Sequence, residues 1–147
     1  MYKSILIPTD GSKLSDKAAK AGLEMAALMD AQVVLLKVVP RYPVSYFEGG
    51  VAAAYSDVGR IEKEWASQAQ AEVDALKTRA EAKGLKAKAV TVRSDLVAEA
   101  IIAAAKKHKC ELIVMASHGR KGLKRLLLGS ETTHVLTHSH IPVMVLR

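Results

Sequence analysis

The sequence predicts an α/β fold, a doubly wound five-stranded parallel sheet with helices on both faces. Apolar runs of strand length alternate along the chain with longer segments whose apolar residues recur every three or four positions. The run over residues 32–39 is apolar almost throughout, which is typical of a strand covered on both faces. Strands that alternate with helices run mostly parallel, because each crossover returns the chain to the same end of the sheet.

The first half of the chain starts with a predicted strand over residues 4–9. An amphipathic helix follows from Leu14, and its apolar positions continue to Met29. The second strand covers residues 32–39. Prolines, a glycine pair and tyrosines then predict a long surface loop over residues 40–59.

The second half continues the same alternation. An apolar stripe that includes Trp65 as a core residue predicts a second helix, with Gly84 placed to end it. A strand over residues 86–92 follows, and Asp95 is expected to cap the third helix. The remaining predicted elements are a strand over 112–115, a short helix over 130–138 and a last strand over 142–146.

Length and composition limit the class of protein. With 147 residues, 50% hydrophobic and 25% charged, we expect one globular domain over residues 1–147. The single cysteine, Cys110, excludes an intramolecular disulfide and a cysteine-rich zinc module. No apolar stretch approaches the roughly 20 residues of a membrane span, so we expect a soluble, cytoplasmic protein with no membrane partner.

The formal net charge of +7 favours anionic partners. Nucleic acid is the least favoured of them, because single-strand binding depends on aromatic stacking and only 4% of the residues are aromatic. A small anion fits better, since open α/β sheets bind ligands beyond the carboxyl ends of their strands.

The segment over residues 115–130 is the strongest candidate for such a site. It begins where a buried strand ends, and Gly129 and Ser130 open the next helix. Glycines let backbone amides approach a phosphate, and a helix N-terminus adds free N–H groups and a partial positive charge. We expect Ser130 to act as N-cap and hydroxyl donor, and His118 is a candidate contact. The flanking cations are Arg120, Lys121, Lys124 and Arg125.

Two familiar phosphate-binding fingerprints do not match this segment. The P-loop requires a lysine between its last glycine and the hydroxyl residue, and the Rossmann pattern requires a glycine where Ser117 stands. The spacing Ala116-x₂-Gly119-x₉-Gly129-Ser130 instead resembles the motif of the universal stress protein family, with alanine in place of the first glycine.

The two ends of the chain extend this resemblance over its whole length. Residues 5–12 look like the first strand of that family and its acidic nucleoside contact, and residues 141–146 resemble its final strand. The resemblance implies binding of ATP, with or without Mg²⁺. It assigns the ribose hydroxyls to Asp10 and the phosphates to Gly119, Gly129 and Ser130.

The family pattern also implies where the rest of the nucleotide lies. Adenine would lie near Pro8, Thr9 and the backbone of Val38, with Ala116 at the inner edge of the pocket. His118 and Arg120 from the segment over residues 115–130 complete the set. The candidate binding residues are therefore Pro8, Thr9, Asp10, Val38, Ala116, His118, Gly119, Arg120, Gly129 and Ser130. The resemblance further implies a homodimer through the last strand, where Val143 and Val145 are expected to offer an exposed apolar edge.

Simpler interpretations of these residues stay open. The glycines could serve only turns and caps, Asp10 could close an Asx-turn or cap the first helix, and the cationic cluster could be a solvated face. His134 and His138 have metal-ligand spacing, but a third ligand is not evident.

The favoured function is an ATP-binding protein of stress response or signalling. It would act by binding and dimerisation on an unknown protein partner, since no catalytic set is evident in the sequence. The alternatives are a nucleotide-free dimeric interaction module and a slow ATPase that uses the same pocket.

Overall fold

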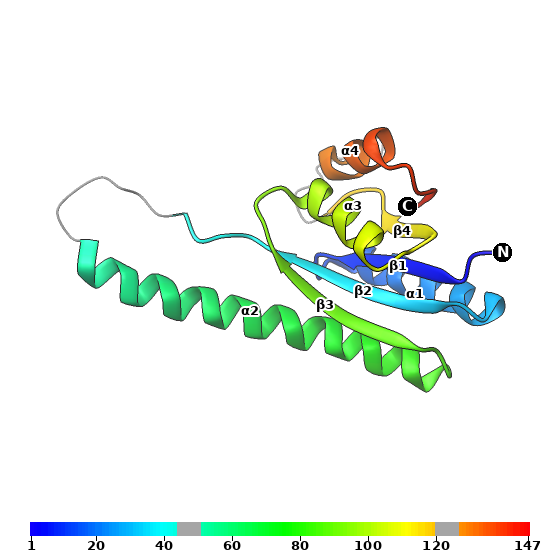
Figure 1. The fold of residues 1–147 in the computed structure, drawn as a ribbon, viewed down its shortest axis with the longest axis horizontal. Helices are drawn as coiled ribbons and strands as arrows, with labels where there is room; N and C mark the ends of the chain where they lie inside the picture. Colours follow the sequence, from blue (N-terminus) through cyan, green and yellow to red (C-terminus); the bar gives the residue numbers. More distant parts are fainter. Residues whose placement is uncertain (44–50, 120–126) are drawn as a thin grey trace.

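The computed structural model confirms the predicted fold class, a five-stranded parallel sheet with strand order β3-β2-β1-β4-β5 (Figure 1). It describes residues 1–43, 51–119 and 127–147, with the backbone alone for residues 51–56. The strands are β1 Ser4–Thr9, β2 Gln32–Val39, β3 Ala87–Arg93, β4 Leu112–Ala116 and β5 Val143–Leu146. The helices are α1 Lys13–Met29, α2 Val51–Ala82, α3 Val97–Lys107 and α4 Ser130–His138.

The two faces of the sheet carry separate apolar cores. Helices α1 and α2 cover one face, and α3 and α4 lie on the other. Neighbours on β1 divide between the two cores, since Ile5 and Ile7 pack toward α1 while Leu6 packs toward α3, all three fully buried. Burial of such a side chain is worth about 1.5–3 kcal/mol. The near-continuous apolar pattern of the central strands is therefore explained by helices on both sides.

The winding direction of the sheet reverses between β1 and β4. The chain runs outward from β1 through β2 to β3, then crosses to β4 on the other side of β1. The connections that leave the carboxyl ends of β1 and β4 turn to opposite faces, which opens a crevice between them. This is where a doubly wound sheet is expected to bind ligands.

The prediction of a long loop over residues 40–59 is wrong in its second part, because α2 already begins at Val51. Residues 44–50 lie outside the described part of the chain. The alanines at positions 52–54 are strong helix formers, and Gly59 lies in the helix, where an added Cβ would touch nothing. One glycine therefore costs the helix only about 1 kcal/mol of propensity. The stop at Gly84 is confirmed by its left-handed φ of 77°.

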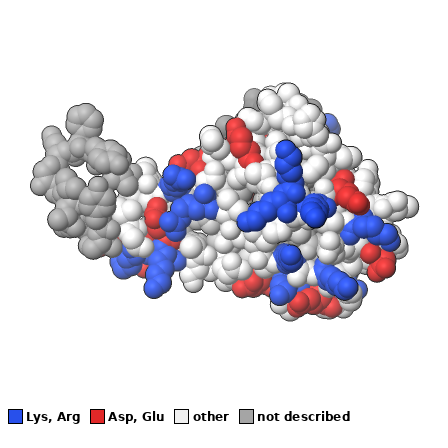
Figure 2. Space-filling view, viewed as in Figure 1, with Lys and Arg blue, Asp and Glu red and all other residues white. Residues whose placement is uncertain are grey.

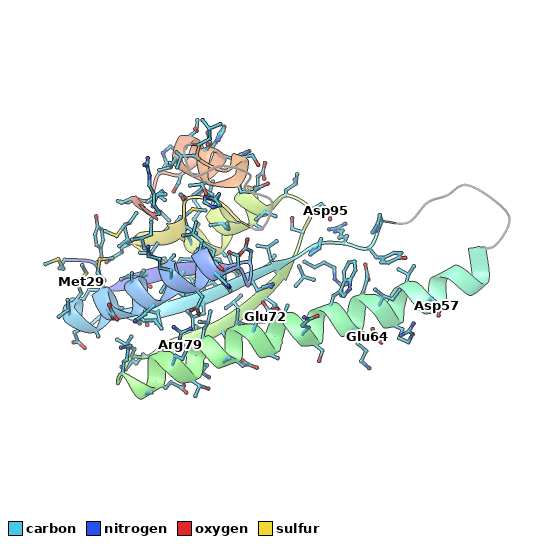
Figure 3. The ribbon with its side chains drawn as sticks, turned by 180° about the vertical axis from the view of Figure 1, so that it is seen from behind. Met29, Asp57, Glu64, Glu72, Arg79 and Asp95 are labelled. Carbon is cyan, nitrogen blue, oxygen red and sulfur yellow. The ribbon has the colours of Figure 1, made fainter. Side chains whose placement is uncertain are left out.

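Helix α2 reaches past the carboxyl ends of the strands (Figure 1). Glu72 and Arg79, on the half beside the sheet, form ion pairs with Lys37 and Asp16 (Figure 3). The other half carries Trp65, which was predicted in the core. It is half-buried instead and lies against Tyr42, with ring centroids 5.7 Å apart.

Two further predictions are wrong. Asp95 does not cap α3, because its carboxylate accepts a hydrogen bond from the Arg41 backbone N–H at 2.9 Å. Val143 and Val145 are half-buried against the core under α3 and α4, while Met144 between them is 40% exposed. Strand β5 has this alternation because one of its faces is covered by helices.

None of the helices that the structure describes is long and apolar enough to cross a membrane.

Candidate functional site

A cavity of about 470 Å³ opens at the carboxyl ends of β1, β2 and β4, and we name it the carboxyl-end cavity. Arg120 and the other flanking cations, Lys121, Lys124 and Arg125, lie outside the described residues. The predicted binding residues that line the cavity are Pro8, Thr9, Asp10, Val38, Ala116, His118, Gly119, Gly129 and Ser130. Lining residues that the sequence analysis did not select are Ser15, Val97, Ile101, Met115, Glu131 and Thr132.

The turn after β1 holds Asp10 in a defined orientation at the cavity. Its Oδ1 accepts the Ser12 backbone N–H at 2.9 Å, which is the Asx-turn that the sequence left open. Gly11 between them has a φ of 78°. Ser12 then caps α1 by accepting the Ser15 backbone N–H at 3.1 Å, so Asp10 does not cap this helix.

The glycines of the motif are required for space. A Cβ on Gly119 would collide with the Asp10 carboxylate oxygen Oδ2, and a Cβ on Gly129 would lie 3.1 Å from the His118 Cα. Gly129 has an ordinary φ of −63°, so a side chain there is disfavoured by this tight contact and not by backbone conformation. The two glycines let the turn after β1, the segment after β4 and the start of α4 come close together.

The start of α4 differs from the prediction by one position. Gly129 is the N-cap residue and Ser130 is the first helical residue, so Ser130 is not the N-cap. The Gly129 N–H donates to the Ser117 carbonyl at 2.8 Å and is not directed at a ligand. The backbone N–H groups of Ser130, Glu131 and Thr132 have no acceptor within the helix, because they belong to its first turn. These amides, together with the helix dipole, form the anion-attracting part of the cavity.

Glu131 connects this helix start to α3. Its Oε2 accepts the Ala98 backbone N–H at 2.9 Å and so takes the capping role that was predicted for Asp95. Leu96 occupies the N-cap position of α3, and its apolar side chain cannot accept a hydrogen bond. One turn further along, His134 Nε2 lies 3.4 Å from Glu99 Oε1. The spacing of α3 and α4 on either side of the cavity is therefore fixed by polar contacts as well as by packing.

An apolar wall faces these polar groups. Val97 and Ile101 come from the first turns of α3, Met115 from β4 and Val38 from β2. Val97 and Ile101 are four positions apart, a spacing that places both side chains on the face of α3 that packs on the core. They lie beside the strand ends, so the same spacing also directs them to the cavity. An apolar wall opposite a few placed polar groups is typical of small-molecule sites.

Few charged side chains are among the described residues that line the carboxyl-end cavity. Asp10 and Glu131 contribute carboxylates, and His118 lies with its Nδ1 3.2 Å from the Ser117 hydroxyl. Within residues 1–43, 51–119 and 127–147, no group of three or more side chains is placed to hold a metal ion. The described lining thus attracts anions through backbone amides and not through a cluster of cationic side chains.

Comparison with known proteins assigns the family. The family model described as "Universal stress protein family" matches residues 1–147. Universal stress protein MJ0531 of Methanocaldococcus jannaschii is 37% identical over all of this chain and 83% of its own length. Universal stress protein YxiE of Bacillus subtilis is 30% identical over the full length of both chains.

Solved structures agree with the sequence comparison. The structure of MJ0577 superposes with a TM-score of 0.83 at 30% identity, over 99% of this chain and 96% of its own. Two more distant neighbours, both with TM-scores of 0.70, are universal stress proteins solved with cAMP and, in Archaeoglobus fulgidus, with dAMP. Their identities of 23% and 17% support the fold. From the family match and the relatives together, this chain belongs to the universal stress protein family.

Proposed function

We propose that this protein binds ATP in the carboxyl-end cavity and acts in stress response or signalling through the bound state. The observation that carries the proposal is the convergence of Asp10, Gly119 and the start of α4 on one cavity. These residues lie after β1, after β4 and at the start of α4, so the fold has to bring them together. The adenine nucleotides bound by the two distant family members support the same ligand class.

The residues present fit the three parts of such a ligand. The apolar wall of Val38, Val97 and Met115 suits a purine ring, and the Asp10 carboxylate suits a pair of ribose hydroxyls. The free amides at the start of α4 suit phosphates. A volume of about 470 Å³ lies within the usual range for small-molecule sites, about 300–1,000 Å³.

The proposal includes Mg²⁺ as a companion of the phosphates. Magnesium in such sites is bound by one or two carboxylates together with phosphate oxygens and water. The carboxylates that line the cavity are those of Asp10 and Glu131. Glu131 accepts the Ala98 backbone N–H through Oε2, which makes its Oε1 a candidate ligand.

Binding without turnover is the favoured mode of action. Phosphoryl transfer requires a group that orients the attacking water and metal ligands that are held in position. His118 is the one described imidazole in the lining, and its Nδ1 is directed to Ser117. The described lining therefore supports a binding site, and slow hydrolysis remains the weaker alternative.

The test is isothermal titration with ATP, ADP and GTP, on wild type and on Ala116→Gly. Ala116 is buried at the edge of the cavity, where the family motif has glycine. Removal of its methyl group is expected to tighten ATP binding, with ATP preferred over GTP. Ala27→Gly, an exposed change on α1, is the control and should leave affinity unchanged. Absence of ATP uptake at millimolar concentration by both wild type and Ala116→Gly would overturn the proposal.

We further propose a homodimer through β5. This strand ends the sheet, so its outer row of N–H and C=O groups lacks a strand partner within the described residues. Light scattering should give a dimer at micromolar concentration. Met144→Glu, which places a charge on the exposed face of β5, should shift it toward monomer, while Leu28→Glu on α1 should not. A monomeric wild type would contradict the proposal.

A further inference from the structure

A second cavity of about 240 Å³ lies at the opposite end of the sheet, and we name it the amino-end notch. It is formed where β2 and β3 begin and α3 ends. Its lining residues are Gln32, Val33, Val34, Lys86, Ala87, Lys88 and His108. None of them belongs to the carboxyl-end cavity, so the notch is a separate feature of the surface.

The sheet topology explains why the notch is open. Strand β3 is the outermost strand on its side, and α3 packs on β2 (Figure 1). Val34 faces the core under α3, and its partner in the parallel register is Lys88. Side chains two apart share a face of a strand, so Lys86 and Lys88 stand on the same side as Val34. His108, just after α3, completes the wall.

The notch is strongly basic. Lys86 and Lys88 are exposed, and Lys107 at the end of α3 is exposed beside His108. None of the three lysines forms an ion pair with any residue that the structure describes. Figure 2 shows basic side chains gathered at the centre of this face, over the end of α3 and the neighbouring β3.

Two of these charges act on the imidazole of His108, which lines the notch. Burial lowers the pKa of His108, and the ammonium groups of Lys88 and Lys107 lower it further. Lys88 belongs to β3 and Lys107 to α3, so cations from two separate elements act on one point in the notch. Among the described residues that line the notch, none is acidic and able to offset these charges. Like charges held close together are unfavourable unless an anion joins them.

We propose that the amino-end notch binds a small phosphate-bearing anion of the inorganic diphosphate class, at a site separate from the nucleotide. Lysine ammonium groups bind phosphate as point charges and need no fixed fork geometry. The volume of about 240 Å³ is below the usual range for small-molecule sites, about 300–1,000 Å³, so the notch suits only a small anion. A single nucleic-acid strand is usually bound on several stacking rings, and the described lining of the notch contains the His108 imidazole but no Phe, Tyr or Trp.

The experiment is a titration of the ¹⁵N-labelled full chain with sodium diphosphate, followed by amide NMR shifts. Saturable shifts are expected at Lys88 and His108, and bound anion should raise the pKa of the His108 imidazole. Lys88→Gln together with Lys107→Gln should weaken binding about tenfold or more. The matched control, Lys20→Gln with Lys63→Gln, removes the same net charge from exposed positions on α1 and α2 and should bind like wild type.

Several outcomes would overturn the proposal. One is an equal loss of diphosphate affinity in both double variants, which would indicate non-specific attraction. Another is the absence of saturable shifts at millimolar diphosphate. Tighter binding of a single-stranded oligonucleotide than of diphosphate at Lys88 would identify a nucleic-acid surface instead. Shifts at Ser130 report the carboxyl-end cavity separately, so failure of the ATP proposal would leave this test intact.

Discussion

The two ends of the sheet attract anions by different means. At the carboxyl end, backbone amides at the start of α4 and two closely packed glycines shape the cavity, and its charged side chains include the carboxylates of Asp10 and Glu131. At the amino end, the attraction comes from Lys86 and Lys88 with Lys107 nearby. One site depends on how closely the backbone approaches, while the other depends on side-chain charge.

This difference predicts different sensitivities. Backbone amides are fixed by the fold, so the carboxyl-end cavity should respond to steric changes and much less to the overall charge of the protein. Exposed ammonium groups are screened over a Debye length of about 8 Å at physiological salt, so binding at the amino-end notch should weaken more steeply as salt rises. The comparison can therefore be tested by changes that affect one end alone.

The largest expected effect comes from Gly119→Ala. Its new Cβ would collide with the Asp10 carboxylate, which the hydrogen bond to the Ser12 N–H holds in place. Either the carboxylate rotates and breaks the Asx-turn, or the segment after β4 moves away. In both cases we expect ATP affinity to fall about tenfold or more by titration calorimetry, which is a loss of about 1.4 kcal/mol or more.

Gly59→Ala provides the matched control for this change. A Cβ on Gly59 meets no atom within 4 Å, and the residue lies within α2. The control should bind ATP like wild type and gain up to about 1 kcal/mol of helix stability. Diphosphate binding at Lys88 should be unchanged in both variants. Unaltered ATP affinity in Gly119→Ala would mean that the close approach of Gly119 to Asp10 does not shape the site.

Much of the carboxyl-end cavity was predictable because its elements are local in sequence. Glycine spacing, a strand end and a helix start lie within residues 115–130, and the topology rule adds the end of β1. The capping of α3 was not predictable in the same way. Asp95 has the residue type and position of a cap, yet Glu131 from another helix accepts the Ala98 N–H. Local sequence does not reveal which distant acceptor lies nearest.

The amino-end notch shows the same limit more clearly. Lys88 and Lys107 are ordinary exposed lysines in the sequence, and the formal charge of +7 does not say where charges gather. Only strand order and register bring Lys88 beside Val34 and into the same notch as His108. The start of α2 was missed for a different reason. The predicted loop was based on prolines, a glycine pair and tyrosines, but the alanines at positions 52–54 favour helix, and Gly59 lies on an open helix surface where it costs little.

A smaller effect is expected from Glu131→Ala. Loss of the acceptor for the Ala98 N–H should cost about 1 kcal/mol, which lowers Tm by about 2–4 °C for a chain of this size. The same change removes a negative charge beside the phosphate position, so in Mg²⁺-free buffer the affinity for ATP should rise several-fold, in contrast to Gly119→Ala. Thermal unfolding and calorimetry on one sample separate the two effects.

Glu99→Ala is the control for Glu131→Ala, since it removes the same charge from the same pair of helices. Its carboxylate is half-exposed and lies 3.4 Å from His134 Nε2, a surface contact that is worth about 1 kcal/mol at most. It should change stability less and leave ATP affinity near that of wild type. An equal loss of stability in both variants would show that Glu131 acts as a general surface charge and not as a cap.

The smallest effect concerns the amino end and depends on pH. Burial and the charges of Lys88 and Lys107 lower the pKa of His108 below its ordinary 6.5, so the unfolded chain takes up this proton more readily than the folded one. The folded protein should therefore lose stability as pH falls from 6.5 through the lowered pKa, and the contribution is fully present above that window. His108→Gln should flatten this part of the stability profile in denaturant melts, while the exposed change His140→Gln should not.

Saturating diphosphate should flatten the wild-type profile in the same window, because a bound anion offsets the lysine charges that lower the pKa of His108. If diphosphate leaves the wild-type profile unchanged, the notch does not hold an anion against His108, and the contrast between the two ends of the sheet reduces to a single binding site.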